Sequence, residues 1–145
     1  MTATPVAARL AHVVVLTAHP SDVVRSRRPH DVRVLTVTSA AHVEQLRAVR
    51  GDPHTTVPAG GGTVLAVRGA RGLAAAGWTA VEHGTSELVW VVTVSTERRR
   101  GIGAAVVAAA VEAAARAGAD LVWLRTHDAA ALRLYRALGF EPTGP

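Results

Sequence analysis

The sequence has no cysteine, no lysine and few aromatic residues: three Trp, one Tyr and one Phe among 145 residues. Without cysteine there can be no disulfide, no thiolate metal site and no cysteine nucleophile. Without lysine, Schiff-base catalysis and the phosphate-binding loop of nucleoside triphosphatases are both excluded. Hydrophobic residues make up 49% of the chain. Ala, Val and Leu must therefore fill the core, and we expect close backbone packing.

Long apolar segments are also missing. The sequence contains no run of about 18 apolar residues, the length that a membrane-spanning helix needs. Its start shows no cleavage pattern of small residues after the short apolar stretch. These features predict a soluble, cytoplasmic protein with no membrane partner, and the length predicts a single domain over residues 1–145.

All 16 basic residues are Arg, which gives a formal charge of +5. A basic chain can bind nucleic acid, and Arg residues cluster at 25–28 and 98–100. Neither cluster has an interleaved aromatic residue on which bases could stack. We therefore expect no nucleic-acid partner, and a duplex binder remains a minor alternative.

The first half of the chain reads as strands around one helix. Strands are expected at 12–16 and 32–38, followed by a helix that Ser39 caps and Gly51 ends. Three further apolar segments separated by turn residues predict an antiparallel meander; they lie at 63–69, 72–82 and 87–94.

The second half alternates helix and strand. An Ala-rich helix is predicted from Gly103 to Ala117, with Gly118 as its C-cap, and a strand follows at 121–126. Asp128 caps a last helix that Gly139 ends, and at most a short strand follows. A strand, helix and strand in succession imply a parallel pair. The predicted fold is α/β (α+β), with a mixed, mostly antiparallel central sheet flanked by helices.

The most informative segment is 91–104, where a strand enters a charged, glycine-containing turn and then the Ala-rich helix. Free backbone N–H groups and the positive end of the helix dipole converge there, which favours an anion such as pyrophosphate. A dinucleotide-binding fingerprint would need a third glycine, which the segment lacks.

This segment resembles the acetyl-CoA signature Arg/Gln-x-x-Gly-x-Gly/Ala of the GNAT superfamily of N-acetyltransferases, matched by Arg98, Gly101 and Gly103. A second motif of that family, Leu-Tyr-x-x-Leu-Gly-Phe, is matched by the only Tyr and the only Phe, Tyr135 and Phe140. The resemblance covers residues 60–142 well. Residues 1–30 match poorly and form an extension or an extra strand. Whether that strand replaces the final hairpin of relatives is left open.

The resemblance implies the GNAT fold, acetyl-CoA as co-substrate and no metal. It implies that Tyr135 protonates the departing thiolate. The residues that it assigns to the cofactor are Val91, Val92, Thr93, Arg98, Arg99, Arg100, Gly101, Ile102, Gly103, Ala104, Asp128 and Tyr135. Relatives usually have Asn where this chain has Asp128, which can cap the helix but cannot donate an amide hydrogen bond.

Direct transfer also needs a base for the acceptor ammonium, because only the neutral amine attacks. Glu87 is the predicted base, at a position where relatives often place a carboxylate; Glu82, His83 and a chain of waters are alternatives. The histidines at 12, 19, 30, 42 and 54 have no metal-ligand spacing. No metal site is therefore expected.

The predicted function is transfer of acetyl from acetyl-CoA to a primary amine of a small molecule or peptide. A catalytically silent acyl-CoA sensor is the alternative. Trp78 and Trp90 either line the acceptor pocket or fill the core. A homodimer is compatible with this prediction.

Overall fold

The computed structural model describes residues 9–25, 27–98 and 101–143. The strands are β1 (Arg9–Ala18), β2 (Arg33–Thr36), β3 (Gly62–Arg68), β4 (Arg71–Trp78), β5 (Thr85–Thr93), β6 (Leu121–Asp128) and β7 (Glu141–Pro142). The helices are α1 (Ala40–Arg50), α2 (Ile102–Arg116) and α3 (Ala129–Leu138), with short 3-10 turns η1 (Pro20–Asp22) and η2 (Ser95–Glu97).

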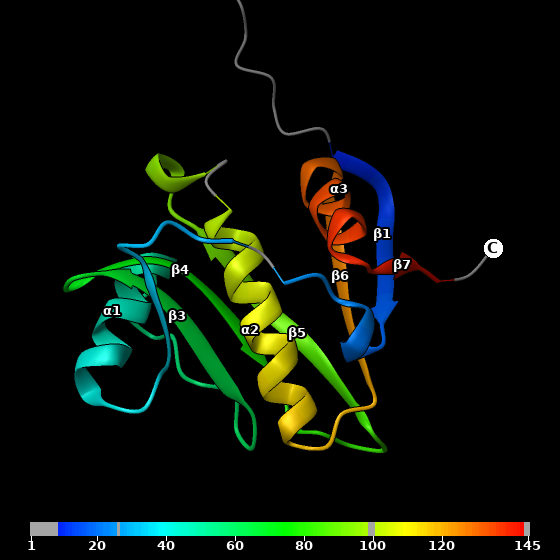
Figure 1. The fold of residues 1–145 in the computed structure, drawn as a ribbon, viewed down its shortest axis with the longest axis horizontal. Coiled ribbons are helices and arrows are strands. Elements are labelled where there is room, and N and C mark those ends of the chain that lie inside the picture. Colours follow the sequence, from blue (N-terminus) through cyan, green and yellow to red (C-terminus); the bar gives the residue numbers. More distant parts are fainter. Residues whose placement is uncertain (1–8, 26, 99–100, 144–145) are drawn as a thin grey trace, which may run out of the picture.

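The seven strands form one sheet in the order β2-β3-β4-β5-β6-β1-β7 (Figure 1). The pair β5–β6 is parallel, and the other neighbouring strands are antiparallel. The mixed, mostly antiparallel sheet that the sequence predicts is confirmed.

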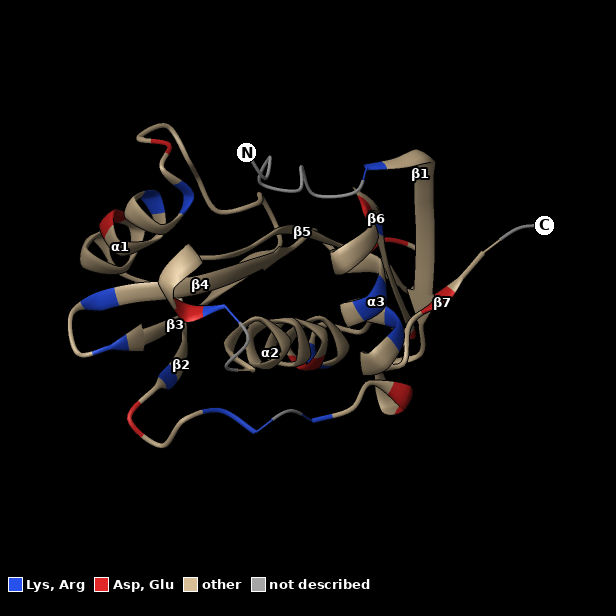
Figure 2. Ribbon diagram, turned by 90° about the horizontal axis from the view of Figure 1, so that it is seen from above, with Lys and Arg blue, Asp and Glu red and all other residues tan. Residues whose placement is uncertain are grey.

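The helices cover the two faces of the sheet unequally. Figure 2 shows α1 on one side of the sheet and α2 on the other. The larger core cluster joins α2 and α3 to the sheet through residues such as Val106, Leu124 and Leu138. The smaller one packs α1 against β3 and β4, through Leu46, Leu65 and others. The face of β5 and β6 that is turned away from α2 therefore has less helical cover.

The helix ends follow the sequence signals. The Ser39 hydroxyl accepts the His42 N–H, and Gly51 ends α1 at φ 66°. The Asp128 carboxylate accepts the Ala130 N–H at the start of α3, and Gly139 ends that helix at φ 110°. Gly118, predicted as the cap of α2, follows the capping residue Ala117 by one position. These caps fix where α3 begins, at the end of β6.

The N-terminal strand lies inside the sheet. β1 pairs with β6 over six positions and with β7 over two, so β1 separates β6 from the C-terminal strand. Leu16 on β1 is fully buried in the larger core. Within residues 1–30, the described segment Arg9–Ala18 forms a strand of the sheet. The chain then crosses to β2 at the other edge of the sheet, with α2 between this connection and the sheet (Figure 2).

Candidate active site

A pocket lies where β5 and β6 stop pairing. Their parallel ladder is confined to Thr85–Glu87 and Leu121–Trp123. Beyond it is a pocket of about 690 Å³ whose lining comes from β5, β6, β1 and α3. Its volume falls within the range typical of small-molecule sites. The pocket lining includes Glu87, Leu88, Val89, Trp90, Val91, Leu124, Arg125, Asp128 and Tyr135.

A β-bulge shapes the β5 wall of this pocket. Val92 pairs with Ala75 and Val89 pairs with Gly77, so Trp90 and Val91 together lie opposite Ala76. Trp90 has a φ of 58°, a left-handed conformation that costs a bulky residue about 1–3 kcal/mol. Backbone strain of this kind clusters at functional sites. Of the two tryptophans left open by the sequence, Trp90 lines the pocket, whereas Trp78 packs against the larger core.

The three strand residues assigned to the cofactor divide between two environments. Val91 lines the pocket and packs against the larger core. Val92 packs against the smaller core below α1, and Thr93 pairs with Ala74. The structure therefore brings Val91 into the pocket, while the side chain of Val92 lies on the other face of the sheet.

The signature turn leads directly into α2. Gly101 is the N-cap at φ 76°, and no side chain caps the helix there. The first N–H groups of a helix have no partner within it, so those of Ile102, Gly103 and Ala104 are placed to bind an anion. A Cβ on Gly103 would lie 2.9 Å from the Thr93 hydroxyl oxygen. Arg98 is exposed, and the predicted contacts of Arg99 and Arg100 lie outside the described residues.

A buried carboxylate anchors the turn just before the signature. Glu97 is 5% exposed, and its Oε1 accepts a 3.0 Å bond from Arg68 of β3. Arg68 also donates a 2.7 Å bond from Nε to Asp31, and this bond is the main reason why the pKa of Asp31 is lowered. Arg68 thus links η2 both to β3, on which it lies, and to the segment that contains Asp31. No sequence signal singled out this pairing, because the residues are far apart along the chain.

Tyr135 lies on α3 with 7% of its surface exposed. Its ring meets Phe140 edge to face, with 6.1 Å between ring centroids. Burial, and then the negative charge of Asp128, raise the pKa of Tyr135 to about 12. At neutral pH the phenol therefore carries its proton and can donate a hydrogen bond into the pocket.

Asp128 caps α3 while lining the same pocket. Its Oδ1 accepts the Ala130 N–H at 2.8 Å, and its own N–H donates to the Thr126 hydroxyl. Because this carboxylate is committed to the helix start, it holds α3, and with it Tyr135, against the end of β6.

Glu87 is the last residue of β5 that pairs with β6, and it lines the pocket. Its side chain is 15% exposed, and Oε2 accepts a 3.1 Å bond from Arg125 Nε. The alternative bases Glu82 and His83 are exposed in the turn before β5, outside the lining of this pocket. Of the predicted base candidates, the structure therefore brings Glu87 to the site. Sequence reasoning missed Arg125, which only the β5–β6 register brings next to Glu87.

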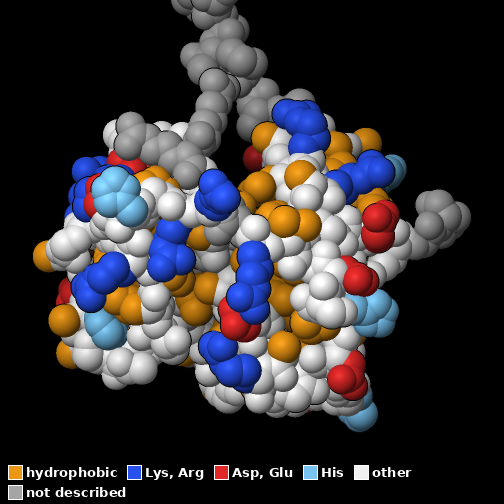
Figure 3. Space-filling model, in the orientation of Figure 1, with side chains coloured by type: hydrophobic (Ala, Val, Ile, Leu, Met, Phe, Trp, Pro, Cys, Tyr) orange, Lys and Arg blue, Asp and Glu red, His pale blue; other side chains and the backbone are white. Residues whose placement is uncertain are grey.

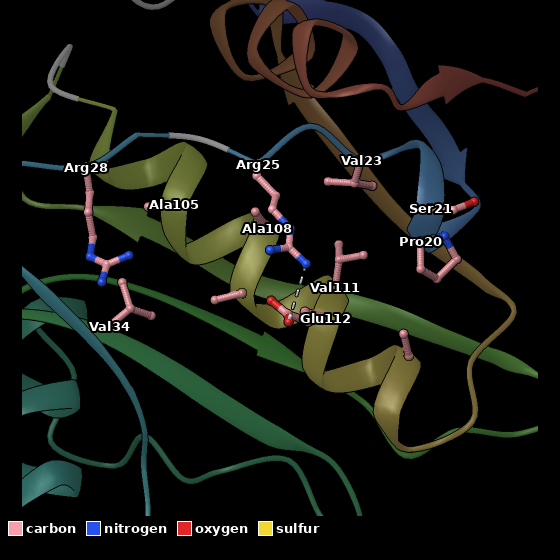
Figure 4. Close-up of a pocket in the computed structure, with 12 residues that line it drawn as sticks. Pro20, Ser21, Val23, Arg25, Arg28, Val34, Ala105, Ala108, Val111 and Glu112 are labelled. Atoms are coloured by element: carbon pink, nitrogen blue, oxygen red, sulfur yellow. Dashed lines mark ion pairs between the residues drawn. The ribbon is translucent and has the colours of Figure 1, made fainter.

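A second depression of about 430 Å³ lies between α2 and the connection from β1 to β2 (Figure 4). Alanines of α2 form much of its floor, and Arg25 reaches to 4.0 Å from the Glu112 carboxylate across it. None of the residues predicted to be catalytic lines this depression. Figure 3 shows that the basic side chains of this face are interspersed with apolar and uncharged ones.

The described residues contain neither a metal-binding cluster nor a membrane-spanning helix. Among them, no three His, Asp or Glu side chains are grouped so as to hold a metal ion. None of the helices in the described ranges is long and apolar enough to cross a membrane.

Comparison with known proteins identifies the family. The GNAT acetyltransferase family matches residues 36–140. The structure is similar to that of a GCN5-related N-acetyltransferase from Kribbella flavida, with 34% identity and a TM-score of 0.77, over 93% of this chain and 56% of that one.

More distant structures share the fold. A GCN5-related N-acetyltransferase from Sphaerobacter thermophilus has 18% identity and a TM-score of 0.71, over 94% of this chain and 50% of that one. A tandem GNAT protein from the clavulanic acid biosynthesis pathway has 15% identity and a TM-score of 0.64, over 90% and 50%. The chain thus spans about half the length of these relatives.

No curated protein sequence matches the chain significantly. The family match extends over most of the chain, and the Kribbella flavida protein is similar in both sequence and structure. The chain therefore belongs to the GNAT acetyltransferase family, a family of acyl-transfer proteins.

Proposed function

We propose that this protein transfers the acetyl group of acetyl-CoA to a primary amine by direct attack of the amine. The observation that carries the proposal is one pocket that holds a buried, protonated Tyr135 and the Glu87 carboxylate, between strands that separate just before the signature turn. Acetyl-CoA supplies the activated thioester.

The residues present fit this co-substrate. The uncapped first turn of α2 offers N–H groups to the pyrophosphate, and the lack of a side chain at Gly103 lets a ligand approach the backbone. The separated strands leave main-chain groups of β5 near Val91 that the β6 ladder does not use. An extended amide-bearing arm can bond to such groups as an added strand would.

The two faces of the sheet divide the pocket between the reactants. Tyr135 and Leu124 belong to the face covered by α2 and α3, where the signature turn also leads. Glu87 and Trp90 lie toward the less covered face. We therefore place the thioester between the strands and the acceptor amine on the side of Glu87.

In this arrangement Glu87 takes a proton from the acceptor ammonium, so that the neutral amine can attack the carbonyl carbon. Of the two carboxylate oxygens of Glu87, only Oε2 accepts a hydrogen bond within the described residues. Oε1 is therefore the oxygen available to the ammonium. As the C–N bond forms, the C–S bond breaks and the sulfur leaves with the electron pair.

Tyr135 stabilises the leaving sulfur. Full proton transfer from a phenol with a pKa of about 12 to a thiolate, whose conjugate acid has a pKa of about 8.5, is uphill. Tyr135 therefore acts mainly by donating a hydrogen bond while the C–S bond breaks. The nitrogen loses two protons in all: Glu87 takes the first from the ammonium and releases it to solvent, and the second, lost as the amide forms, balances the proton that the thiol gains.

The test is steady-state thiol release from acetyl-CoA with a panel of amines, amino acids, aminoglycosides and peptides, followed by mass analysis of the acylated product. Tyr135→Phe keeps the ring packing, so CoA affinity should stay close to that of the parent while kcat falls on the order of 100-fold. Loss of turnover in Tyr135→Phe together with loss of CoA binding would show a structural role only. CoA binding without thiol release from any acceptor would contradict the proposed transfer and favour the silent acyl-CoA sensor.

A further inference from the structure

We propose that the acceptor is an amine that carries a carboxylate on the same carbon, an α-amino acid, and that Arg125 binds this carboxylate. The inference rests on the proposed function and names its substrate class. It follows from the charges at the mouth of the pocket, where a cation and an anion lie side by side.

The strand register places these charges together. Val122 and Leu124 of β6 point into the core below α2, so Trp123 and Arg125 alternate onto the opposite, less covered face. Glu87 is paired directly with Trp123 across the parallel ladder. The three side chains therefore share one face of the sheet, at the edge of the pocket.

Arg125 has hydrogen-bond donors that its contact with Glu87 does not use. Its side chain is 62% exposed, whereas that of Glu87 is 15% exposed. Arg125 donates Nε to Glu87, and its guanidinium lies 5.7 Å from the Trp123 ring centroid. In the part of the chain that the structure describes, no other hydrogen bond or ion pair engages its terminal nitrogens. A guanidinium edge of this kind binds a carboxylate through two parallel hydrogen bonds.

The pair matches the charges of an α-amino acid. Only one carbon separates the ammonium from the carboxylate, and Glu87 and Arg125 are themselves in contact. The ammonium can therefore face Glu87 while the carboxylate faces Arg125, so each charge meets its opposite. A polyamine would instead bring a second cation toward Arg125, which like-charge repulsion disfavours.

The surroundings also admit an apolar side chain. Val13, Val89 and Trp90 line the same pocket, and the Trp90 ring is held by Arg50, whose guanidinium carbon is 4.9 Å from the ring centroid. Arg50 is in turn fixed by a 3.1 Å bond to the Thr55 hydroxyl. An amino acid bound through its charged end would find apolar surface beside it.

The test compares α-amino acids with their own carboxamides as acceptors, measured as kcat/KM for thiol release. The carboxamides keep the amine and the side chain but lose the negative charge. Their amines are also less basic, so solution reactivity near neutral pH favours them. For the parent we expect the best amino acid to exceed its carboxamide by roughly tenfold or more, the worth of one charge-assisted contact.

Arg125→Gln should abolish this preference by lowering kcat/KM far more for the acid than for the carboxamide, chiefly through KM. Because Arg125 also donates to Glu87, any effect that acts through Glu87 should lower both acceptors alike and leave their ratio unchanged. Arg116→Gln is the matched control, because Arg116 is similarly exposed (68%) and pairs with a glutamate, Glu112, on α2. The control should keep the preference.

Carboxamides that react as well as acids in the parent, or an Arg125→Gln variant that still prefers acids, would overturn the inference and leave the proposed function standing. Absence of thiol release with acids, carboxamides and simple amines alike would overturn both.

Discussion

Tyr135 is a residue whose ionisation can be observed without interference. The chain has no Lys, no Cys and no other Tyr, so no other side chain except Arg titrates above about pH 9. Burial and the Asp128 charge raise the pKa of Tyr135 to about 12. Tyrosinate absorbance against pH should therefore show one transition with a midpoint near 12, well above the ordinary value of 10.0.

Asp128→Asn should move this midpoint downward, but not as far as the ordinary value, because burial is the larger cause. Asn still caps a helix, so α3 should persist. A midpoint for the folded parent at the ordinary value would contradict the burial of the phenol.

The raised pKa also links Tyr135 to stability. The unfolded chain releases the phenol proton near pH 10 and the folded chain near pH 12, so stability is lost as pH rises through this window. The free energy of unfolding should fall by up to about 2–3 kcal/mol across it. Tyr135→Phe should remove this component, which chemical denaturation at several pH values would measure.

Gly103 is constrained from two sides. An added Cβ would approach the Thr93 hydroxyl at 2.9 Å, and we propose that the pyrophosphate binds at the N–H groups of the same helix turn. Gly103→Val should therefore weaken CoA binding strongly, as calorimetric titration would measure. Gly103→Ala/Thr93→Ala removes the contact within the protein, so it tests whether the ligand itself excludes a side chain. Full recovery of CoA affinity in that double variant would mean that Gly103 serves only helix packing.

The turn between β4 and β5 carries backbone strain that a substitution can relieve. His83 and Gly84 have φ values of 52° and 75°, and Glu82 and Thr85 exchange two backbone bonds around them. Two positive φ values are typical of a type I′ turn, which favours Asn-Gly. His83→Asn should stabilise the protein by on the order of 0.5 kcal/mol.

Thermal unfolding would measure this gain. His54→Asn is the matched control, because His54 is also exposed but has no positive φ. A gain of the same size in both variants would show that the turn conformation is not its source.

Two positions on β1, one buried and one exposed, test whether this strand belongs to the sheet. Leu16 is fully buried between β6 and β7, whereas Val13 on the same strand is 43% exposed. Leu16→Ala should cost about 2–5 kcal/mol of unfolding free energy, since it leaves a cavity. Val13→Ala should cost less than about 1 kcal/mol. Equal and small losses in denaturant titrations would mean that β1 does not belong to the sheet.

Much of this fold follows from local signals. Ser39, Gly51, Asp128 and Gly139 mark helix ends through capping chemistry that acts within a few residues, so the helices were predicted close to their observed bounds. The meander is predicted by equally local signals, apolar segments separated by turn residues. The sequence leaves the place of β1 open, because its partners on β6 lie more than 100 residues away and leave no local trace.

The residues of the candidate site also fall into those that the sequence predicts and those that it does not. The sequence pointed to Tyr135, Glu87 and the signature glycines through motifs, and their roles stay predictions. The positive φ of Trp90 and the contact of Arg125 with Glu87 could not be predicted, because both arise from the register of β5 against its neighbours. Tertiary pairing, rather than residue type, creates these features.

The proposed function depends on acetyl-CoA binding where β5 and β6 separate, against the start of α2. The most direct measurement is thermal unfolding of the parent and of Gly103→Val with increasing CoA or acetyl-CoA. A ligand that binds only the folded chain stabilises it by about 2.7 kcal/mol at a hundred times its dissociation constant. The melting temperature of the parent should thus rise by several degrees, and that of Gly103→Val should rise far less. An unchanged melting curve of the parent at millimolar CoA would contradict this binding.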